Sequence, residues 1–227
     1  MKIVIFDVDG TLVDTNYAHV ESWHRALKTF GVFIPRARIH QCMGLDTKGT
    51  FSKILTSRQI EEFGNNCANL KTEIYRHEML PEIEAFPKVR DLFLILKNAR
   101  ISIALATSAT KKLVNDYLKK LDIIGLPDVV ITAEEIHRGK PDPEIFVKAW
   151  KKLRSGRSSP SEVAVIGDSI WDIEAAVAAG FYAVGVLSGG YSECSLQKAG
   201  TSEIYLDVTD LYNKLDNSRI MQQSLKI

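Results

Sequence analysis

Two carboxylates stand one residue apart near the start of the chain, in the segment FDVDGT at residues 6–11. The apolar run that precedes them is typical of a buried strand. Because residues two apart on a strand face the same side, we expect Asp7 and Asp9 to project toward one pocket while Val8 points into the core. Such neighbours can divide acid and base chemistry, since a carboxylate bound to a metal stays ionised while one beside apolar surface can hold a proton.

Further polar residues follow candidate strands later in the chain. They stand in TS at residues 107–108, in GKPDP at residues 139–143 and in GDSIWD at residues 167–172. Asp168 matches Asp7 in position, because each ends a predicted parallel strand at the same edge of the sheet. Carboxylate oxygens are hard ligands that suit Mg²⁺. We therefore expect Asp7 and Asp168 to bind Mg²⁺ together.

The elements that must position these residues follow an alternating pattern. Short runs rich in Val and Ile alternate with segments of helical period, which indicates a parallel sheet covered on both faces. Helix starts are marked by Pro87 and by Asp142-Pro143, in which an acceptor cap is followed by proline. The fold class is therefore α/β. The expected strands are residues 2–7, 101–106, 128–132, 163–167 and 182–187, with a weaker one near 203–207.

The interval between the first and second expected strands contains no strand-like run. It is too long for a simple crossover between neighbouring strands. Helical spacing fills it instead, first at Val20, Trp23 and Leu27, and this helix is expected to end at Gly31. We infer a small helical domain, about residues 15–83, over the carboxyl end of the first strand. Ligands of open α/β sheets bind at that edge.

The segments DVDGT, TS, GKPDP and GDSIWD resemble, in this order, the four motifs of the haloacid dehalogenase-like superfamily of phosphotransferases. Each motif alone is weak evidence, because Asp9-Gly10 also fits a turn and Lys140 also fits a solvated loop. Four in order, each at its strand or loop position, form a specific pattern that covers nearly the whole chain. The resemblance implies a Rossmann-like sheet of strand order 3-2-1-4-5, a core of residues 1–14 and 84–215, and an inserted helical cap of residues 15–83.

The resemblance also assigns roles to the acids. It implies that Asp7 is the nucleophile that forms an aspartyl-phosphate, and that Asp9 protonates the leaving oxygen and then activates water as a base. Asp9 is expected to contact the metal through its backbone carbonyl only. The resemblance implies that Asp172 contacts the metal ligands or a metal-bound water rather than the metal itself. Alternatively, an acid in the first turn of a helix is favoured simply by the helix dipole.

A phosphate monoester dianion repels an anionic nucleophile. Attack by a carboxylate therefore requires positive charge in contact with the phosphoryl group. Mg²⁺ and Lys140 would supply that charge. Hydroxyl and backbone N–H groups are expected to hold the phosphoryl oxygens, and they belong to Gly10, Thr11, Thr107 and Ser108.

Two cap residues are expected to contact the substrate. His19 lies in the first turns of the cap, at a spacing common in capped phosphatases and phosphomutases of this superfamily, and would orient the substrate. The loop CMGLDTK at residues 42–48 is similar to the specificity loop of such caps, in which Lys48 would reach an anion of the substrate. The stretch SGGY at residues 188–191 is expected to form a loop at the rim of the site.

The main functional hypothesis is a Mg²⁺-dependent phosphatase acting on a small phosphorylated metabolite. A β-phosphoglucomutase-like mutase is the alternative, but such members usually carry a glutamate where this chain has Gly167 and an arginine where it has Thr47. A catalytically silent phosphate-binding protein on the same fold would be expected to lack an acid or the lysine. The metal-free dehalogenases lack the second aspartate, so Asp9 disfavours that class.

Composition bounds the remaining possibilities. A net charge of +1 gives no electrostatic footprint for nucleic acid or an anionic membrane. The three cysteines are far apart and indicate neither a disulfide framework nor a zinc site. No leader or membrane-spanning tract is expected, which favours a cytoplasmic protein. Residues 216–227, polar and without period, are expected to form a loosely held tail. The identity of the substrate and the oligomeric state stay open, and a monomer is compatible with the sequence.

Overall fold

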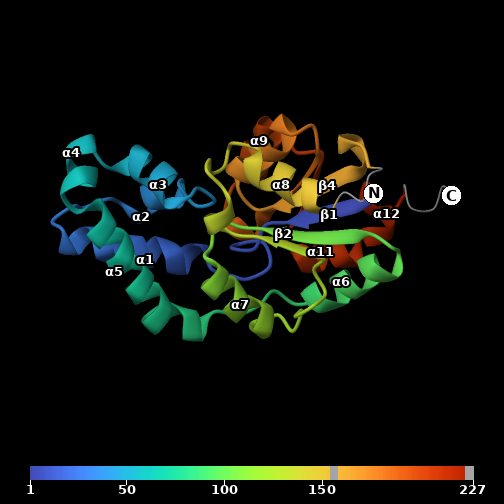
Figure 1. Cartoon of the computed structure of the whole chain (residues 1–227), viewed down its shortest axis with the longest axis horizontal. Coiled ribbons are helices and arrows are strands. Elements are labelled where there is room, and N and C mark those ends of the chain that lie inside the picture. Colours follow the sequence, from blue (N-terminus) through green and yellow to red (C-terminus); the bar gives the residue numbers. More distant parts are fainter. Residues whose placement is uncertain (154–157, 223–227) are drawn as a thin grey trace.

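Six parallel strands form a single sheet in the order β3-β2-β1-β4-β5-β6. Figure 1 shows β1 between β2 and β4. The structure is a computed structural model of the chain, and it describes residues 1–153 and 158–222. The predicted α/β class and the order 3-2-1-4-5 are confirmed, and the weak segment near residues 203–207 adds a sixth strand at the edge. The strands are β1 Ile3–Phe6, β2 Ser102–Ala106, β3 Val129–Ile131, β4 Val163–Gly167, β5 Tyr182–Val186 and β6 Glu203–Tyr205.

The central strand, β1, is buried along its whole length. Its register places Phe6 beside Leu105 of β2 and beside Ile166 of β4. The three strands therefore end at one edge of the sheet, and the polar residues that follow them meet there. The strand order also reverses at this place, with β2 on one side of β1 and β4 on the other, which is where α/β sheets bind ligands.

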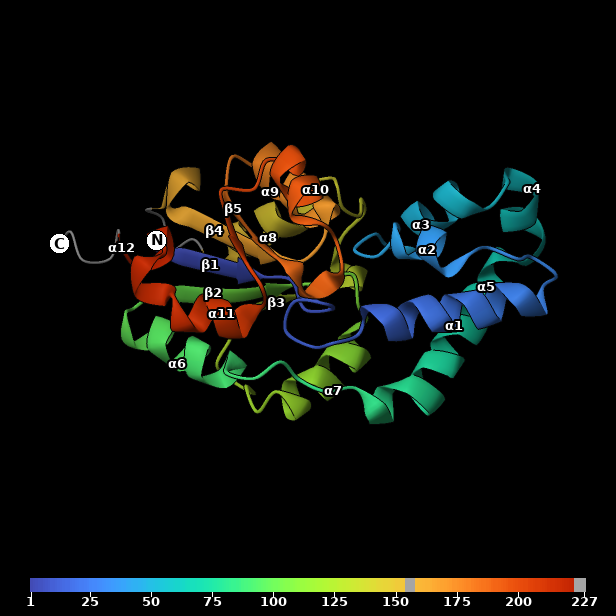
Figure 2. The ribbon, with the colours of Figure 1, turned by 180° about the vertical axis from the view of Figure 1, so that it is seen from behind.

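Helices cover both faces of the sheet (Figures 1 and 2). Each face buries its own hydrophobic cluster, which explains why the strands read as continuous apolar runs. One face is covered by α6 Val89–Asn98, α7 Lys111–Lys120, α11 Val208–Asn213 and α12 Arg219–Gln222. The other is covered by α8 Glu144–Leu153, α9 Ile170–Ala178 and α10 Glu193–Ala199.

Local capping interactions explain where two of these helices begin. The backbone N–H of Glu144 donates to Asp142 Oδ1 (2.9 Å) at the start of α8, as the Asp-Pro pair predicts. At α9 the side chain of Ser169 accepts from the backbone of Asp172, and the Asp172 carboxylate accepts from the backbone of Ser169. This reciprocal cap fixes the first turn of α9 directly after Asp168. None of the helices in the described ranges combines the length and apolar character needed to cross a bilayer.

The segment between β1 and β2 forms a separate group of helices beside the sheet (Figures 1 and 2). It buries its own hydrophobic cluster, in which Trp23, Leu27 and Phe51 take part. Its helices are α1 Asn16–Thr29, α2 Arg36–His40, α3 Thr47–Ile54, α4 Ser57–Gln59 and α5 Asn65–Ile74, and π-helical turns at Ile60–Gly64 and Tyr75–Met79 extend α5 at both ends.

Two extended linkers join this helical segment to the sheet. They run side by side, because the N–H of Asp14 donates to the carbonyl of Glu84 (3.0 Å) and the N–H of Phe86 donates to that of Leu12 (3.0 Å). Paired linkers of this kind can act as a hinge. That the sheet and the helical segment are two separate domains, a core and a cap, stays a prediction.

The structure differs from the expected loose tail at residues 216–222. These residues form a 3₁₀ turn followed by α12, and Ile220 is fully buried. The N-terminal amine of Met1 donates to the carbonyl of Ile220 (2.5 Å), and Ser218 Oγ donates to Glu203 Oε2 (2.6 Å). Helical period is weak in so short a helix, and its partners lie at the other end of the chain and on β6. Residues 223–227 lie outside the described part.

Packing of α12 predicts a measurable loss of stability in Ile220→Ala. Removing a fully buried isoleucine side chain should lower the free energy of unfolding by about 2 to 5 kcal/mol. The exposed change Asp216→Ala serves as the control and should shift it by no more than about 0.5 kcal/mol. Urea denaturation of both variants measures the difference. Equal stabilities would show that α12 does not pack on the sheet in solution.

Candidate active site

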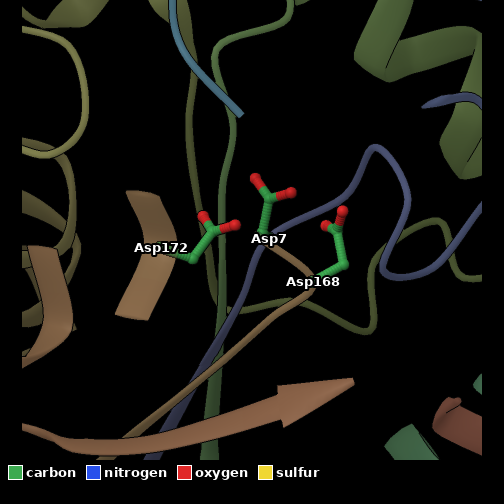
Figure 3. Close-up of side chains that lie close together, drawn as sticks. All are labelled: Asp7, Asp168 and Asp172. Atoms are coloured by element: carbon green, nitrogen blue, oxygen red, sulfur yellow. The ribbon is translucent and has the colours of Figure 1, made fainter. Parts of the chain in front are cut away.

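Three aspartates from different elements meet at the carboxyl edge of the sheet (Figure 3). Asp7 follows β1, Asp168 follows β4, and Asp172 lies in the first turn of α9. All three are buried, and one carboxylate oxygen of each lies within 4.8 Å of the others. The structure therefore brings together Asp7 and Asp168, as their positions after parallel strands predict, and adds Asp172 to them.

Lys140 supplies positive charge inside this cluster. Its Nζ lies 2.5 Å from Asp7 Oδ1 and 2.6 Å from Asp172 Oδ1, and its side chain is buried. Burial alone would lower the pKa of Lys140, but the two carboxylates outweigh it and hold that pKa above its usual value. Lys140 is therefore a charged ammonium group that bridges two of the three acids.

One ammonium group does not balance three buried carboxylates. Burial, with the neighbouring acids, raises the pKa of Asp7 well above its usual value despite the opposing effect of Lys140. Burial and the charge of Asp172 raise the pKa of Asp168 to about 7. Buried charge without a partner is unfavourable. The excess of negative charge and the hard oxygen donors both fit a divalent cation such as Mg²⁺.

Two side chains hold Asp168 in place. Thr11 Oγ1 donates to Asp168 Oδ1 (2.8 Å), and Asn16 Nδ2 donates to Asp168 Oδ2 (2.8 Å). In this conformation the hydroxyl of Thr11 points at an acid and Thr11 does not line the cavity described below, so phosphate binding by Thr11 stays a prediction that the geometry does not support. The position of Asn16 in the site depends on α1 starting beside Asp168 and Gly189, which spacing in the sequence does not reveal.

Gly10 is also placed differently from our expectation. Its N–H donates to the carbonyl of Val13 (2.9 Å) and to Thr15 Oγ1 (3.1 Å), so it does not point at a ligand. Gly10 instead permits close packing: its φ is +78°, and a Cβ there would lie 2.5 Å from Asp168 Oδ2. Its role is to let the loop after β1 pass close to Asp168.

A cavity of roughly 160 Å³ opens beside Asp7, between the sheet edge and the helical segment. Ser108 Oγ is buried and has no hydrogen-bond partner among the residues that the structure describes, although it lies in the wall of this cavity. A ligand oxygen would satisfy it. The predicted site residues that line the cavity are Asp7, Asp9, His19, Thr107, Ser108 and Lys140.

Asp9 is surrounded by hydrogen-bond donors. Its Oδ1 accepts from Thr15 Oγ1 (2.9 Å), His19 Nε2 (2.9 Å) and Tyr117 OH (2.7 Å). Burial alone would raise the pKa of Asp9, but His19 and the other donors outweigh it and lower that pKa below its usual value. We expected apolar surroundings that let Asp9 hold a proton. This conformation instead favours its ionised form, because the helical segment and α7 contribute polar groups at this point.

His19 lies between Asp9 and a lysine. Its Nε2 faces Asp9, and its Nδ1 lies 3.0 Å from Lys71 Nζ, which can only donate. His19 is thus neutral, with the proton on Nε2, and burial together with the charge of Lys71 lowers its pKa. Burial also lowers the pKa of Lys71, to about 8.

The lysine of the helical segment that lines the cavity is Lys71, not Lys48. Lys48 is exposed on α3 and is absent from the cavity wall, so the expectation that it reaches the substrate is not supported. The loop that contains it does contribute, since Met43, Gly44 and Leu45 line the cavity. Lys71 carries no motif in the sequence. Its position in the cavity follows only from the packing of α5 against α1.

The glycine-rich stretch at residues 188–191 lies beside Asp168, since a Cβ at Gly189 would clash with the Asp168 carboxylate, but none of its residues lines the cavity. It contacts the helical segment. His40 Nε2 donates to the carbonyl of Gly189 (2.7 Å), and Tyr191 OH donates to the carbonyls of Gln41 (3.1 Å) and Met43 (3.1 Å). These bonds hold the loop after α2 against the sheet domain. The helical segment therefore contacts the loop after β5 in this conformation.

Comparison with known proteins agrees with this arrangement. Residues 4–186 match the family model described as haloacid dehalogenase-like hydrolase. The chain is 29% identical to a phosphorylated carbohydrates phosphatase of Thermotoga maritima over 79% of its own length and 82% of the relative. It is also 29% identical to a β-phosphoglucomutase of Bacillus subtilis, over 83% and 84%. The crystal structure of a hydrolase from Pseudomonas syringae is similar with a TM-score of 0.86 at 31% identity, covering 96% of this chain and 99% of that one.

The buried acids predict an unusual dependence of stability on pH. An aspartate with an unfolded pKa of about 3.9 and a folded pKa of about 7 keeps a proton in the folded state that the unfolded chain has lost. In buffer containing a chelator, the free energy of unfolding should therefore fall as pH rises from about 4 to about 7.

Millimolar Mg²⁺ should remove much of this fall, since a bound cation keeps the acids ionised in the folded state. Urea denaturation across the pH range, with and without Mg²⁺, measures both effects. Asp168→Asn should show a smaller slope, which separates this group from other titrating residues. A wild-type stability that rises with pH in chelator, with no response to Mg²⁺, would contradict the assignment of this cluster.

Proposed function

The chain belongs to the haloacid dehalogenase-like hydrolase family, and on this premise we propose that it is a Mg²⁺-dependent phosphatase. It would hydrolyse a small phosphate monoester through an aspartyl-phosphate formed on Asp7. Relatives that are named phosphatases support a phosphoric monoester hydrolase. The observation that carries the proposal is the Asp7 carboxylate, which lines the cavity, contacts Lys140 and belongs to the cluster of three acids.

Electrostatics explains why these groups belong together. The carboxylate of Asp7 and a phosphate dianion repel each other, so attack needs positive charge at the phosphoryl group. Lys140 Nζ, in contact with Asp7, is one source. Mg²⁺, held by Asp7 and Asp168 with Asp172 nearby, would supply the rest of the charge when bound. Contact of Mg²⁺ with the backbone carbonyl of Asp9 stays a prediction.

The proposed reaction has two steps. An oxygen of Asp7 attacks phosphorus, the bond from phosphorus to the ester oxygen breaks, and Asp9 gives its proton to that oxygen. A water molecule then attacks the phosphorus of the aspartyl-phosphate while Asp9 takes its proton. Inorganic phosphate leaves and Asp7 is restored. Ser108, in the cavity wall, would hold a phosphoryl oxygen during both steps. Thr107 also lines the cavity and would do the same once its hydroxyl, which donates to Asp9 Oδ2 in this conformation (3.4 Å), turned toward the substrate.

The surroundings of Asp9 suit the second step of this cycle. Its donors Thr15, His19 and Tyr117 favour the ionised form, which is the form that accepts a proton from water. For the first step Asp9 must carry a proton, and its lowered pKa opposes this, so the proposed acid role requires that the surroundings of Asp9 change when substrate binds. Both roles require that the carboxylate keep its orientation while it gains and loses a proton.

We assign the helical segment, residues 15–83, the role of a cap that closes over the cavity and excludes water. The paired linkers, residues 12–14 and 84–86, would be the hinge. The volume of roughly 160 Å³ fits a small substrate better than a drug-sized one, for which cavities of about 300 to 1,000 Å³ are usual. The proposed substrate class is a small phosphorylated metabolite, and a sugar phosphate is supported by the Thermotoga maritima relative.

Two positions favour hydrolysis over the mutase reaction. A Cβ at Gly167 would lie 2.4 Å from Cβ of Asp172, so the glutamate expected in β-phosphoglucomutase-like proteins does not fit beside Asp172 as it stands. The other position, Thr47, holds no arginine. The β-phosphoglucomutase of Bacillus subtilis among the relatives nevertheless makes the mutase the second candidate.

A panel of phosphorylated metabolites separates these two functions. We expect Mg²⁺-dependent release of inorganic phosphate, which a chelator abolishes, from one or a few small phosphate monoesters. Measuring kcat/KM across the panel identifies the substrate, and phosphorus NMR of the products distinguishes release from transfer. Conversion of a sugar monophosphate to its positional isomer, with little free phosphate, would favour the mutase. A folded sample that turns over no phosphoester would refute both.

Variants of the two N-terminal acids test the division of roles. Asp7→Asn should abolish turnover and weaken Mg²⁺ binding, because it removes the nucleophile and a metal ligand. Asp9→Asn should bind Mg²⁺ normally but lower kcat by about 10²-fold to 10⁴-fold. Steady-state kinetics and calorimetric titration with Mg²⁺ measure both, with the exposed change Asp216→Asn as the control. Equal losses of Mg²⁺ affinity in the two variants would contradict the assignment.

A further inference from the structure

Two buried tyrosines connect the helical segment to Asp9. Tyr117, on α7, donates its hydroxyl proton to Asp9 Oδ1 (2.7 Å). Tyr75, at the end of the helical segment, has its hydroxyl 2.5 Å from that of Tyr117. Both side chains are essentially fully buried. A buried phenol hydroxyl normally needs a hydrogen-bond partner. Here the two hydroxyls satisfy each other in a chain of hydrogen bonds that ends on the Asp9 carboxylate.

The direction of both hydrogen bonds follows from proton counting. An ionised carboxylate only accepts, so the single hydroxyl proton of Tyr117 goes to Asp9. Tyr117 then has only lone pairs to offer, and Tyr75 must donate to it. The bond from Tyr75 therefore leaves Tyr117 oriented as a donor toward Asp9. Removing the Tyr75 hydroxyl would leave Tyr117 without this constraint.

Tyr75 supports a second donor to the same carboxylate oxygen. Its ring stacks on His19, with ring centroids 4.0 Å apart and an interplanar angle of 18°, and His19 Nε2 donates to Asp9 Oδ1. Tyr75 thus contacts both of these donors, His19 through its ring and Tyr117 through its hydroxyl. It belongs to the helical segment by sequence, yet it packs in the hydrophobic cluster of the sheet domain.

Arg76, next to Tyr75, also joins the helical segment to α7. Arg76 NH2 lies 3.3 Å from Asp116 Oδ2, directly before Tyr117 on α7. Tyr75 can occupy its position only while the end of the helical segment is docked against α7. The orientation of two donors to Asp9 therefore depends on docking.

We propose that Tyr75 and Tyr117 are positioning residues that couple docking of the helical segment on α7 to the orientation of the Asp9 carboxylate. The proposal rests on the proposed phosphatase function, in which Asp9 transfers protons. Tyr117 reaches the reaction only through its bond to Asp9, and the hydroxyl of Tyr75, although Tyr75 lines the cavity, is engaged by Tyr117. They would act only through Asp9, and Tyr75 would act through Tyr117 and His19.

Kinetics of phenylalanine variants test this dependence. Tyr117→Phe should lower kcat by about 10-fold to 100-fold with little change in KM, and Tyr75→Phe by about fivefold. In an Asp9→Asn background both effects should shrink to within about twofold, because the residue through which they act has been removed. Tyr205→Phe is the matched control, since Tyr205 is also buried and donates to a carboxylate, Glu203, at the far edge of the sheet. It should leave kcat unchanged.

Losses that persist in the Asp9→Asn background, or an unchanged kcat in Tyr117→Phe, would overturn the proposal. Thermal denaturation of each variant excludes unfolding as the cause. Hydrogen exchange gives a readout that needs no activity: amides of residues 75–79 should exchange faster in both variants than in wild type or Tyr205→Phe, and equal exchange would overturn the coupling. A wild-type protein without phosphatase activity would refute the proposed function, while this exchange experiment would still decide whether the tyrosines hold the two parts together.

Discussion

The site depends on an imbalance of buried charge. Three carboxylates and one ammonium group lie within a few ångströms of each other, away from water, at the edge of the sheet. Such an arrangement is costly for a folded chain unless further positive charge is present. The same arrangement suits a ligand pair of opposite kinds, a divalent cation and a phosphate group. The excess of buried negative charge therefore explains both why the site is unfavourable without a cation and why it can bind one.

The sheet makes this concentration of charge possible. Strands β1, β2 and β4 are adjacent, parallel and in register, so the residues after each strand converge although they are far apart in sequence. The backbone pairing of the strands and the apolar clusters on both faces hold the edge rigidly. Thr11 and Asn16 then fix Asp168, and the reciprocal cap of α9 fixes Asp172. Each acid is thus held by interactions that do not involve the ligand, which is the condition for a preorganised site.

The helical segment contributes polar groups rather than an apolar lid over Asp9. His19 comes from α1, Lys71 from α5 and Tyr75 from the turn that follows α5, and the sheet domain adds Tyr117. Around Asp9 these groups form a connected set of donors, whereas around Asp7 the neighbours are an ammonium group and other acids. Two aspartates separated by one residue therefore stand in opposite environments. Their pKa values shift in opposite directions, with that of Asp7 raised and that of Asp9 lowered. The proposed nucleophilic role of Asp7 therefore needs a bound cation to keep its carboxylate ionised.

Several features of this protein could be predicted from its sequence alone. The α/β class, the five main strands, the helical insertion and the convergence of Asp7, Lys140 and Asp168 all follow from apolar periodicity and from polar residues at strand ends. The resemblance of the four motifs to the haloacid dehalogenase-like superfamily is confirmed by the family match. These properties are local, or they follow from the rule that parallel strands end at a common edge.

Other features were decided only by the tertiary structure. Thr11 faces Asp168 rather than a ligand, Lys71 rather than Lys48 lines the cavity, and α12 packs where a loose tail was expected. Asn16 bonds Asp168 across 152 positions of sequence, and Tyr117 bonds Asp9 across 108. Such contacts depend on how one helix packs against another element, and helical period indicates which face is buried but not what it meets.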